Sequence, residues 1–131
     1  MPSRLSAAAL AVLATFGLAA CEKQNPYITL TASGKVVKAR AVRYCRGDDC
    51  RVTSDNPTLR MEPGSPVGID VPRSVAEDGW QVVLRAQRQQ SAVFHDHYRS
   101  LGIPVSEEPL ELSIVREGDE DGEWRFTLVA E

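Results

Sequence analysis

Alternation of apolar with polar residues constrains the fold of this 131-residue chain more than any other feature. It is clearest in residues 110–114 and 124–128, where every second residue is large and apolar. Successive side chains of a strand point to opposite faces, so each segment predicts a half-buried β-strand. Residues 117–122, which are acidic and contain two glycines, predict the turn that joins the two strands into a hairpin. The alternating residues are Leu110, Leu112 and Ile114, then Trp124, Phe126 and Leu128.

The same period of two recurs in five further segments, separated by stretches rich in glycine, proline, serine and aspartate. About seven short strands at a spacing of roughly ten residues are typical of a β-sandwich. We therefore expect an all-β fold, a small immunoglobulin-like β-sandwich, with a small barrel as the alternative. The five segments are residues 27–32, 35–45, 59–61, 67–71 and 80–86.

Local features modify this plain alternation. In residues 35–45 the apolar set changes face after Ala41, which predicts a β-bulge there, because one inserted residue re-aims the alternation. Residues 74–77 fit a capping box and Gly79 follows as a helix-ending residue, so we expect a single helical turn. Residues 87–106 show no clear period and are predicted to be irregular.

The amino-terminal 20 residues have the organisation of a bacterial secretory signal. Arg4 supplies positive charge, and residues 5–18 are almost entirely apolar. This run is short for a retained membrane helix, which needs about 20 apolar residues. Residues 18–21, Leu-Ala-Ala-Cys, form a lipobox, in which the thiol of Cys21 receives diacylglycerol and becomes the new amino terminus.

The lipobox predicts both the location and the domain organisation of the protein. We expect residues 1–20 to be removed as a lipoprotein signal peptide and residues 21–26 to form a lipidated tether. Residues 27–131 then form a single extracytoplasmic domain at the cell membrane. Two acyl chains anchor such a protein stably, at about 0.8 kcal/mol per buried methylene.

The cysteine count and the net charge narrow the possibilities further. Of three cysteines, lipid takes Cys21, so Cys45 and Cys50 remain as a pair for a disulfide in an oxidising compartment. The formal net charge of −3 leaves no basic face for nucleic acid. The same mild acidity argues against electrostatic attraction to anionic lipid, so the acyl chains must supply the anchoring.

Several stretches, taken together, carry a family resemblance. They are the lipobox followed by Glu-Lys, the cysteine pair in residues 44–50, Val-Gly-Ile-Asp-Val-Pro at 67–72, Gly-Trp-Gln-Val at 79–82, and residues 94–98. The chain in this respect resembles small actinobacterial lipoproteins of the Streptomyces type, which are classed as a domain of unknown function. Its preference for arginine over lysine is typical of a GC-rich actinobacterial genome. The resemblance implies a place in the cell envelope and no activity.

His95 and His97 are the one pair with metal-like spacing. On an extended strand both would point the same way and share zinc or copper, whereas Asp96 would face away. Because a third ligand is missing, we expect neither metal nor another cofactor. A metal-binding lipoprotein using His95 and His97 stays as the alternative function.

Catalytic signals are also missing, so we expect a protein that is not an enzyme. No serine lies in a Gly-x-Ser-x-Gly elbow, and pairing Cys45 with Cys50 removes the thiol that cysteine catalysis needs. A hydrolase with an unrecognised site is the third option.

A non-enzymatic binding or cell-envelope accessory module is therefore the leading interpretation, and it requires an envelope protein as partner. Edge strands and the irregular segment 87–106 offer the contact surface, with Phe94, Tyr98 and Arg99 as candidate contacts. The alternative is that both aromatic rings pack beneath that segment. The sequence does not specify the partner.

Overall fold

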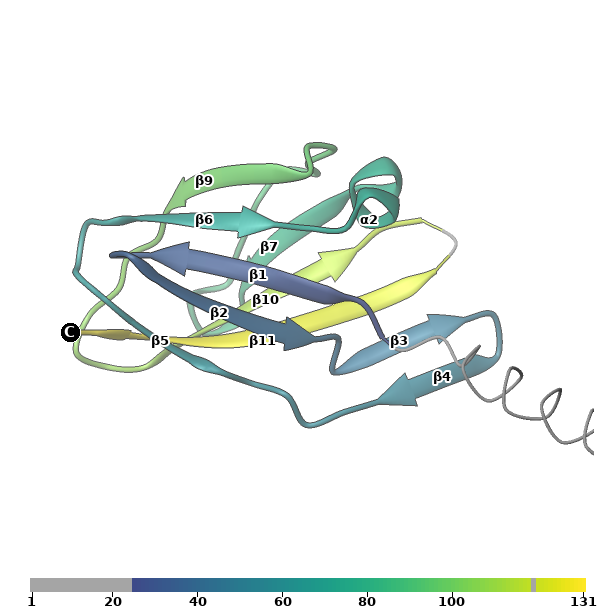
Figure 1. The fold of residues 1–131 in the computed structure, drawn as a ribbon, viewed down its shortest axis with the longest axis horizontal. Coiled ribbons are helices and arrows are strands. Elements are labelled where there is room, and N and C mark those ends of the chain that lie inside the picture. The colour runs from purple at the N-terminus through teal and green to yellow at the C-terminus, as the bar shows by residue number, and fades with distance from the viewer. Residues whose placement is uncertain (1–24, 119) are drawn as a thin grey trace, which may run out of the picture.

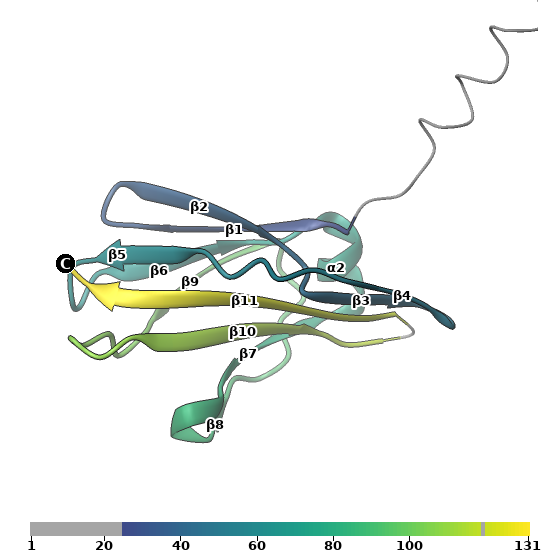
Figure 2. The same cartoon turned by 90° about the horizontal axis from the view of Figure 1, so that it is seen from below.

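Two β-sheets packed face to face make up the protein (Figures 1 and 2). The computed structural model describes residues 25–118 and 120–131. Within these residues, eleven strands and two short helical segments confirm the all-β sandwich that alternation predicts. The predicted signal peptide, Cys21 and the first part of the tether lie outside the described residues. No helix among the residues described has the length and apolar character to cross a membrane.

The first sheet has four strands in the order β2-β1-β6-β9, all antiparallel. β1 and β2 form a hairpin, and β9 is the edge strand on the opposite side of the sheet. The strands are β1 (Tyr27–Ala32), β2 (Lys35–Arg40), β6 (Pro66–Asp70) and β9 (Tyr98–Gly102).

The second sheet has the order β4-β3-β11-β10-β7-β8, and β5 adds to β11 as its one parallel pair. Two helical segments flank β7: α2 (Arg73–Asp78) precedes it and the 3₁₀ helix η1 (Arg85–Gln87) follows it. The strands are β3 (Arg43–Arg46), β4 (Asp49–Val52), β5 (Thr58–Met61), β7 (Trp80–Leu84), β8 (Gln89–Gln90), β10 (Leu110–Arg116) and β11 (Asp121–Ala130).

The β10–β11 hairpin has the register that its alternation predicts. Both apolar trios face the interior, and their members lie directly opposite one another across the two strands. The pairs are Leu110 with Leu128, Leu112 with Phe126, and Ile114 with Trp124.

Trp80 and Trp124 anchor the core, and both side chains have no exposed surface. The Trp124 indole N–H donates to the carbonyl oxygen of Pro26 at 2.9 Å, and the Trp80 indole N–H donates to that of Asp96 at 2.8 Å. Burial of each ring therefore leaves no unsatisfied donor. The core cluster runs from Ile28 to Leu128, so the described residues contain a complete core.

The predicted β-bulge near Ala41 is wrong, because the chain changes sheet at this point. β2 belongs to the first sheet and β3 to the second, and between them the Val42 N–H donates to the Glu123 carbonyl oxygen at 2.8 Å. Ala39, Ala41, Val42 and Tyr44 are all buried, as expected. A crossing between sheets turns both apolar faces inward, which a bulge within one strand would also have done.

The helical turn exists, but the capping box does not. α2 begins after Pro72, and no side chain caps its first turn. Gly79 ends the helix at a φ of 100°, and its N–H donates to the Val75 carbonyl oxygen at 2.9 Å. Asn25, which was assigned to the tether, is buried, and its side-chain amide donates to the Ala41 carbonyl oxygen at 3.2 Å.

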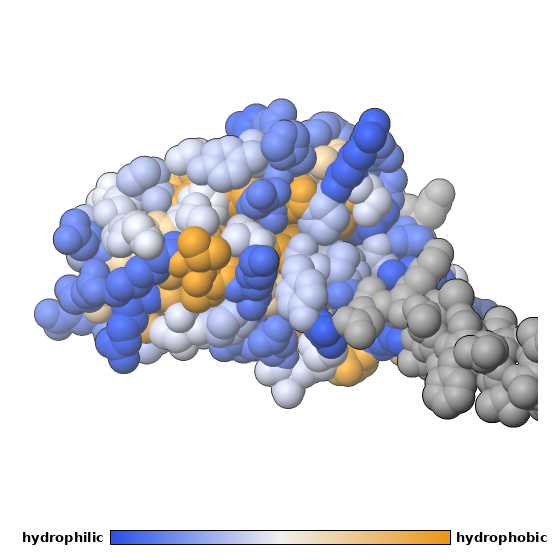
Figure 3. Space-filling model, viewed as in Figure 1, coloured by the Kyte–Doolittle hydropathy of each residue, from blue (hydrophilic) through white to orange (hydrophobic). Residues whose placement is uncertain are grey.

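Residues 87–106 are more regular than predicted, since they contain β8 and the whole of β9. Ala86, predicted to continue the face of β7, is exposed in η1. The outer face of the first sheet is polar at most positions, and Figure 3 shows apolar surface on this face only in patches bordered by hydrophilic residues.

Candidate functional site

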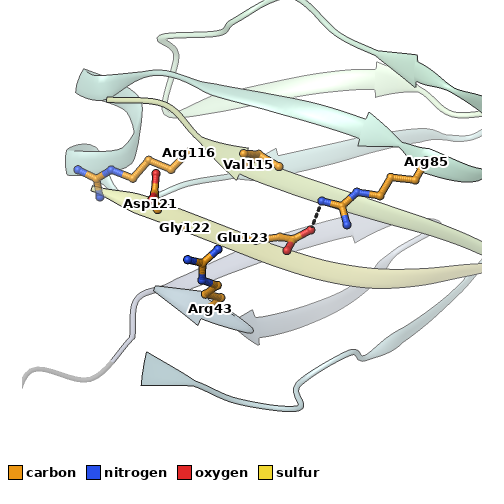
Figure 4. A pocket seen from close by; sticks show the side chains of 7 residues that line it. All are labelled: Arg43, Arg85, Val115, Arg116, Asp121, Gly122 and Glu123. Carbon is orange, nitrogen blue, oxygen red and sulfur yellow. Dashed lines mark ion pairs between the residues drawn. The ribbon is translucent and has the colours of Figure 1, made fainter. Parts of the chain in front are cut away.

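A charged pocket of about 260 Å³ lies on the outer face of the second sheet (Figure 4). Glu123 stands at its centre and forms ion pairs with Arg85 at 2.5 Å and with Arg125 at 3.4 Å. Arg43 lies directly across the β3–β11 ladder from Glu123. The described lining residues include no hydroxyl, thiol or imidazole, so the pocket offers paired charges and no nucleophile.

Arg116 is the one fully buried charged side chain among the residues described, at 6% exposure. Its guanidinium pairs with Asp78 at 2.5 Å and with Glu120 at 3.4 Å, and it also donates to the hydroxyl of Tyr44. A further bond reaches the Ser74 carbonyl oxygen at 3.3 Å. The network joins α2, β3 and the β10–β11 turn, so it satisfies the buried charge and holds one end of the sandwich together.

Tyr44 completes this network. Its hydroxyl donates to Glu120 Oε2 at 2.6 Å, and its ring packs edge-on against Trp124 with the centroids 6.0 Å apart. Burial, followed by the hydrogen bond to Glu120, raises the pKa of Tyr44 to about 12. The phenol therefore stays protonated at neutral pH and does not serve as a general base there.

His95 and His97 lie exposed on the loop between β8 and β9. The Asp96 carboxylate between them accepts a hydrogen bond from Arg99 Nε at 2.9 Å, so its partner is an arginine and not a histidine. Within residues 25–118 and 120–131, no three His, Cys, Asp or Glu side chains come close enough to hold a metal ion. The described residues thus give the metal-binding alternative no support.

The three aromatic and basic candidates do not form one surface. Phe94 is half-buried and packs edge-on against Trp80 at a centroid distance of 5.1 Å, and the guanidinium of Arg99 covers it at 4.1 Å. Tyr98 is instead half-exposed and lies across Gly68, where a Cβ would approach the Tyr98 hydroxyl to 2.4 Å. Packing beneath the loop therefore holds for Phe94 and not for Tyr98.

An apolar groove of about 490 Å³ opens between the edge strand β9 and the strands β7 and β8. Its apolar lining consists of Val82 and Leu84 of β7, Leu101 of β9 and Ile103, which follows β9. Leu101 is half-buried and the other three side chains are buried. Four polar residues form the rim, namely Arg88, Gln89, Gln90 and Ser91. An apolar floor with a polar rim is the usual form of a binding site.

The groove lies beside an unpaired strand edge. The Val71 N–H donates to the His97 carbonyl oxygen at 2.8 Å. Every second residue of an antiparallel strand bonds to the same neighbouring strand, so Arg99 is the next residue after His97 whose N–H and C=O groups bond to β6. The N–H and C=O groups of Tyr98, Ser100 and Gly102 consequently point away from β6, toward the free edge. β9 thus presents donors and acceptors next to an apolar floor.

The sequence did not predict this groove, although residues 87–106 were expected to offer a contact surface. Leu101 and Ile103 are separated by one residue, a two-residue spacing that continues the β-pattern. With only two apolar residues, the signal was too short to identify β9. Its pairing with β6, which brings Leu101 opposite Val67, depends on contacts distant in sequence.

Cys45 and Cys50 form the predicted disulfide. They lie directly opposite each other in the β3–β4 ladder, with their Cα atoms 4.0 Å apart. The bond closes a turn around Gly47, which adopts a φ of 62°. Its position makes it a local cross-link of one hairpin and not a link between the sheets.

The fold and its surfaces define a small β-sandwich domain with a disulfide in one hairpin and an apolar groove. A family model described as "Protein of unknown function (DUF2771)" matches residues 21–129. The chain therefore belongs to the DUF2771 family, which confirms the predicted resemblance to a domain of unknown function. No curated protein and no solved structure matches the chain.

Proposed function

We propose that this protein is a lipid-anchored module of the bacterial cell envelope that binds another envelope protein and catalyses no reaction. The lipobox at residues 18–21 supports the anchor. The family match covers residues 21–129 and so includes Cys21, the residue that would carry the lipid. Together with the family resemblance, this favours an actinobacterial lipoprotein on the extracytoplasmic face of the membrane.

The groove between β9 and β7 is the observation that carries the binding role. The groove is hollowed at the flank of the sandwich between β7 and β9, where Leu101 is half-buried and Val82, Leu84 and Ile103 lie beneath it with less than a tenth of their surface exposed. An extended segment of a partner would pair with the free edge of β9 and place alternate side chains in the groove. Leu101, the least buried of the apolar lining residues, would contact those side chains.

The rim of the groove indicates the chemistry of the segment that fits. Arg88 is exposed and forms no ion pair with any residue that the structure describes. Gln89 and Gln90 add amides that accept and donate hydrogen bonds. An extended peptide with alternating apolar side chains would place those side chains on the apolar floor. An acidic residue of that peptide would pair with Arg88 on the rim.

Photocrosslinking in intact cells tests this proposal. A photoreactive residue at Gln90, on the rim, is expected to crosslink an envelope protein, whereas the same residue at Lys38, on the opposite edge strand β2, is not. Adding Ser100→Pro removes an edge-facing N–H and is expected to abolish the Gln90 adduct. No adduct at Gln90, or the same adducts at Lys38, would refute a binding role for the groove.

A further inference from the structure

The amino-terminal end of the domain is held against the β3–β4 hairpin. The side-chain amide of Asn25, the first described residue, donates to the carbonyl oxygens of Ala41 at 3.2 Å and Arg51 at 3.4 Å. Cys21 precedes Asn25 by four residues, which span at most about 14 Å when fully extended. If Cys21 carries the lipid of the proposed function, this hairpin must lie close to the bilayer.

The hairpin region is basic although the whole chain is mildly acidic. Residues 40–52 contain four arginines and two aspartates, whereas the chain carries a formal net charge of −3. Arg43 and Arg51 are both exposed, and the described residues offer neither of them an ion-pair partner closer than 4 Å. Arg51 is therefore available to an anion outside the protein, and so is Arg43, which lies across the β3–β11 ladder from Glu123 but forms no ion pair with it.

Val52 adds an apolar group to the same surface. It is 75% exposed, more than any other large hydrophobic residue in the described chain. It lies opposite Arg43 in the β3–β4 ladder, so these two side chains share one face of the hairpin, whereas the preceding residue Arg51 points to the other face. Because β4 is the edge strand of its sheet, a bilayer that approaches this edge meets Val52 with an arginine on either face. An exposed apolar side chain flanked by arginines suits the membrane interface, where the apolar group enters the headgroup region and the arginines bind phosphates.

We infer that the β3–β4 hairpin is a lipid-facing surface, in which Val52 enters the headgroup layer and Arg43 and Arg51 pair with the phosphates of anionic phospholipids. The formal net charge of the whole chain argued against attraction to anionic lipid, but that total does not show where on the surface the individual arginines lie. The surface also orients the domain. The lining of the groove includes Gly102, the last residue of β9. In Figure 1 the carboxy-terminal end of β9 lies toward the end of the sandwich away from β3 and β4, so the groove would lie on the side away from the membrane.

A tethered-vesicle experiment tests the inference. Residues 21–131 contain the complete core, and the Cys45–Cys50 disulfide leaves Cys21 as the free thiol for coupling to a maleimide lipid. Trp80 and Trp124 have no exposed surface, so Val52→Trp provides a selective reporter of lipid contact. The vesicles contain phosphatidylglycerol brominated near the headgroup, which quenches tryptophan on contact. Val36→Trp is the matched control. Val36 is 60% exposed, and it lies at the start of β2, the end of that strand farther from β3 along the chain.

The expected result is strong quenching of the tryptophan of Val52→Trp and little quenching of that of Val36→Trp. Replacing the brominated phosphatidylglycerol by phosphatidylcholine brominated at the same position should reduce the quenching, as should Arg51→Gln. Each lost arginine should also weaken binding of the untethered chain to phosphatidylglycerol vesicles about fivefold. Equal quenching at both positions, or quenching insensitive to Arg51→Gln and to lipid charge, would overturn the inference. Because the thiol coupling supplies the anchor, this outcome does not depend on whether cells lipidate Cys21.

Discussion

Arg116 occupies the fourth inward position of β10, after Leu110, Leu112 and Ile114, so a charge lies where the alternation calls for an apolar side chain. The sequence pattern shows the position but not the partners, because Asp78 is distant along the chain. Only the folded arrangement of α2 beside the β10–β11 turn explains why a buried arginine is tolerated here.

Arg116→Leu should destabilise the domain by about 3 kcal/mol, because it leaves Asp78 and Glu120 close together without their cation. Chemical denaturation measures the free energy of unfolding. Arg125→Leu is the control, since Arg125 pairs with Glu111 and Glu123 on the exposed outer face and should cost at most about 1 kcal/mol. Equal losses in both variants would contradict a special role for Arg116.

Tyr44 makes the stability of the folded domain depend on pH in the alkaline range. Its pKa is about 12 in the folded protein and about 10 in an unfolded chain. A raised pKa favours the protonated form in the folded state, so this stabilisation is complete below about pH 10 and is lost as the pH rises toward 12. Absorbance at 295 nm should show one of the three tyrosines titrating late, and Tyr44→Phe should remove that step. A late step that survives Tyr44→Phe would contradict the assignment.

At the scale of elements, segments that alternate over five or more residues were predictable. β1 has the predicted bounds, and the β10–β11 hairpin has the predicted inward faces, although Asp121 and Gly122, which were predicted in its turn, begin β11. The crossing after Ala41 was not predictable, because a bulge and a change of sheet produce the same shift in the apolar pattern. β9 was missed because its side chains are mostly polar and its stability comes from pairing with β6.

The Cys45–Cys50 disulfide belongs to one hairpin, so its reduction should have a local effect. The short loop that it closes contributes about 2 kcal/mol in the chain-entropy model. Hydrogen exchange after reduction should speed up in residues 43–52 and stay slow in β10 and β11, whose core contacts do not involve the bond. Uniformly faster exchange across both sheets would show that the disulfide supports the whole fold.

The direction of backbone groups in β9 makes a matched pair of proline variants informative. The Ser100 N–H points to the free edge, whereas the Arg99 N–H faces Ile69 within the ladder. Ser100→Pro should therefore keep the domain folded, and Arg99→Pro should cost about 2 kcal/mol more through a lost ladder bond and an unsatisfied carbonyl oxygen. Arg99→Ala corrects for the side chain. Similar unfolding free energies for the two proline variants would contradict the assigned edge.

At the scale of the whole molecule, two surfaces lie toward opposite ends of one sandwich: the basic hairpin β3–β4 beside Asn25, and the apolar groove beside Gly102. The sequence predicts a lipid anchor from the lipobox, which is a contiguous motif, and the anchor stays a prediction. The sequence did not predict the groove, whose walls come from β7, β9 and the segment after η1. A site assembled from distant segments emerges only when strand order is known.

The final prediction concerns the anchor. Cys21→Ser should abolish acyl labelling and release the protein from membranes, because the thiol is the group that receives the diacylglycerol and two acyl chains supply the anchoring energy. Metabolic labelling with a fatty acid, followed by membrane fractionation, measures both effects. The double variant Cys45→Ser with Cys50→Ser is the control: it removes the disulfide, keeps Cys21, and should still be labelled. If Cys21→Ser retains both the label and the membrane fraction, the lipobox interpretation is wrong, and another segment must hold this domain at the membrane.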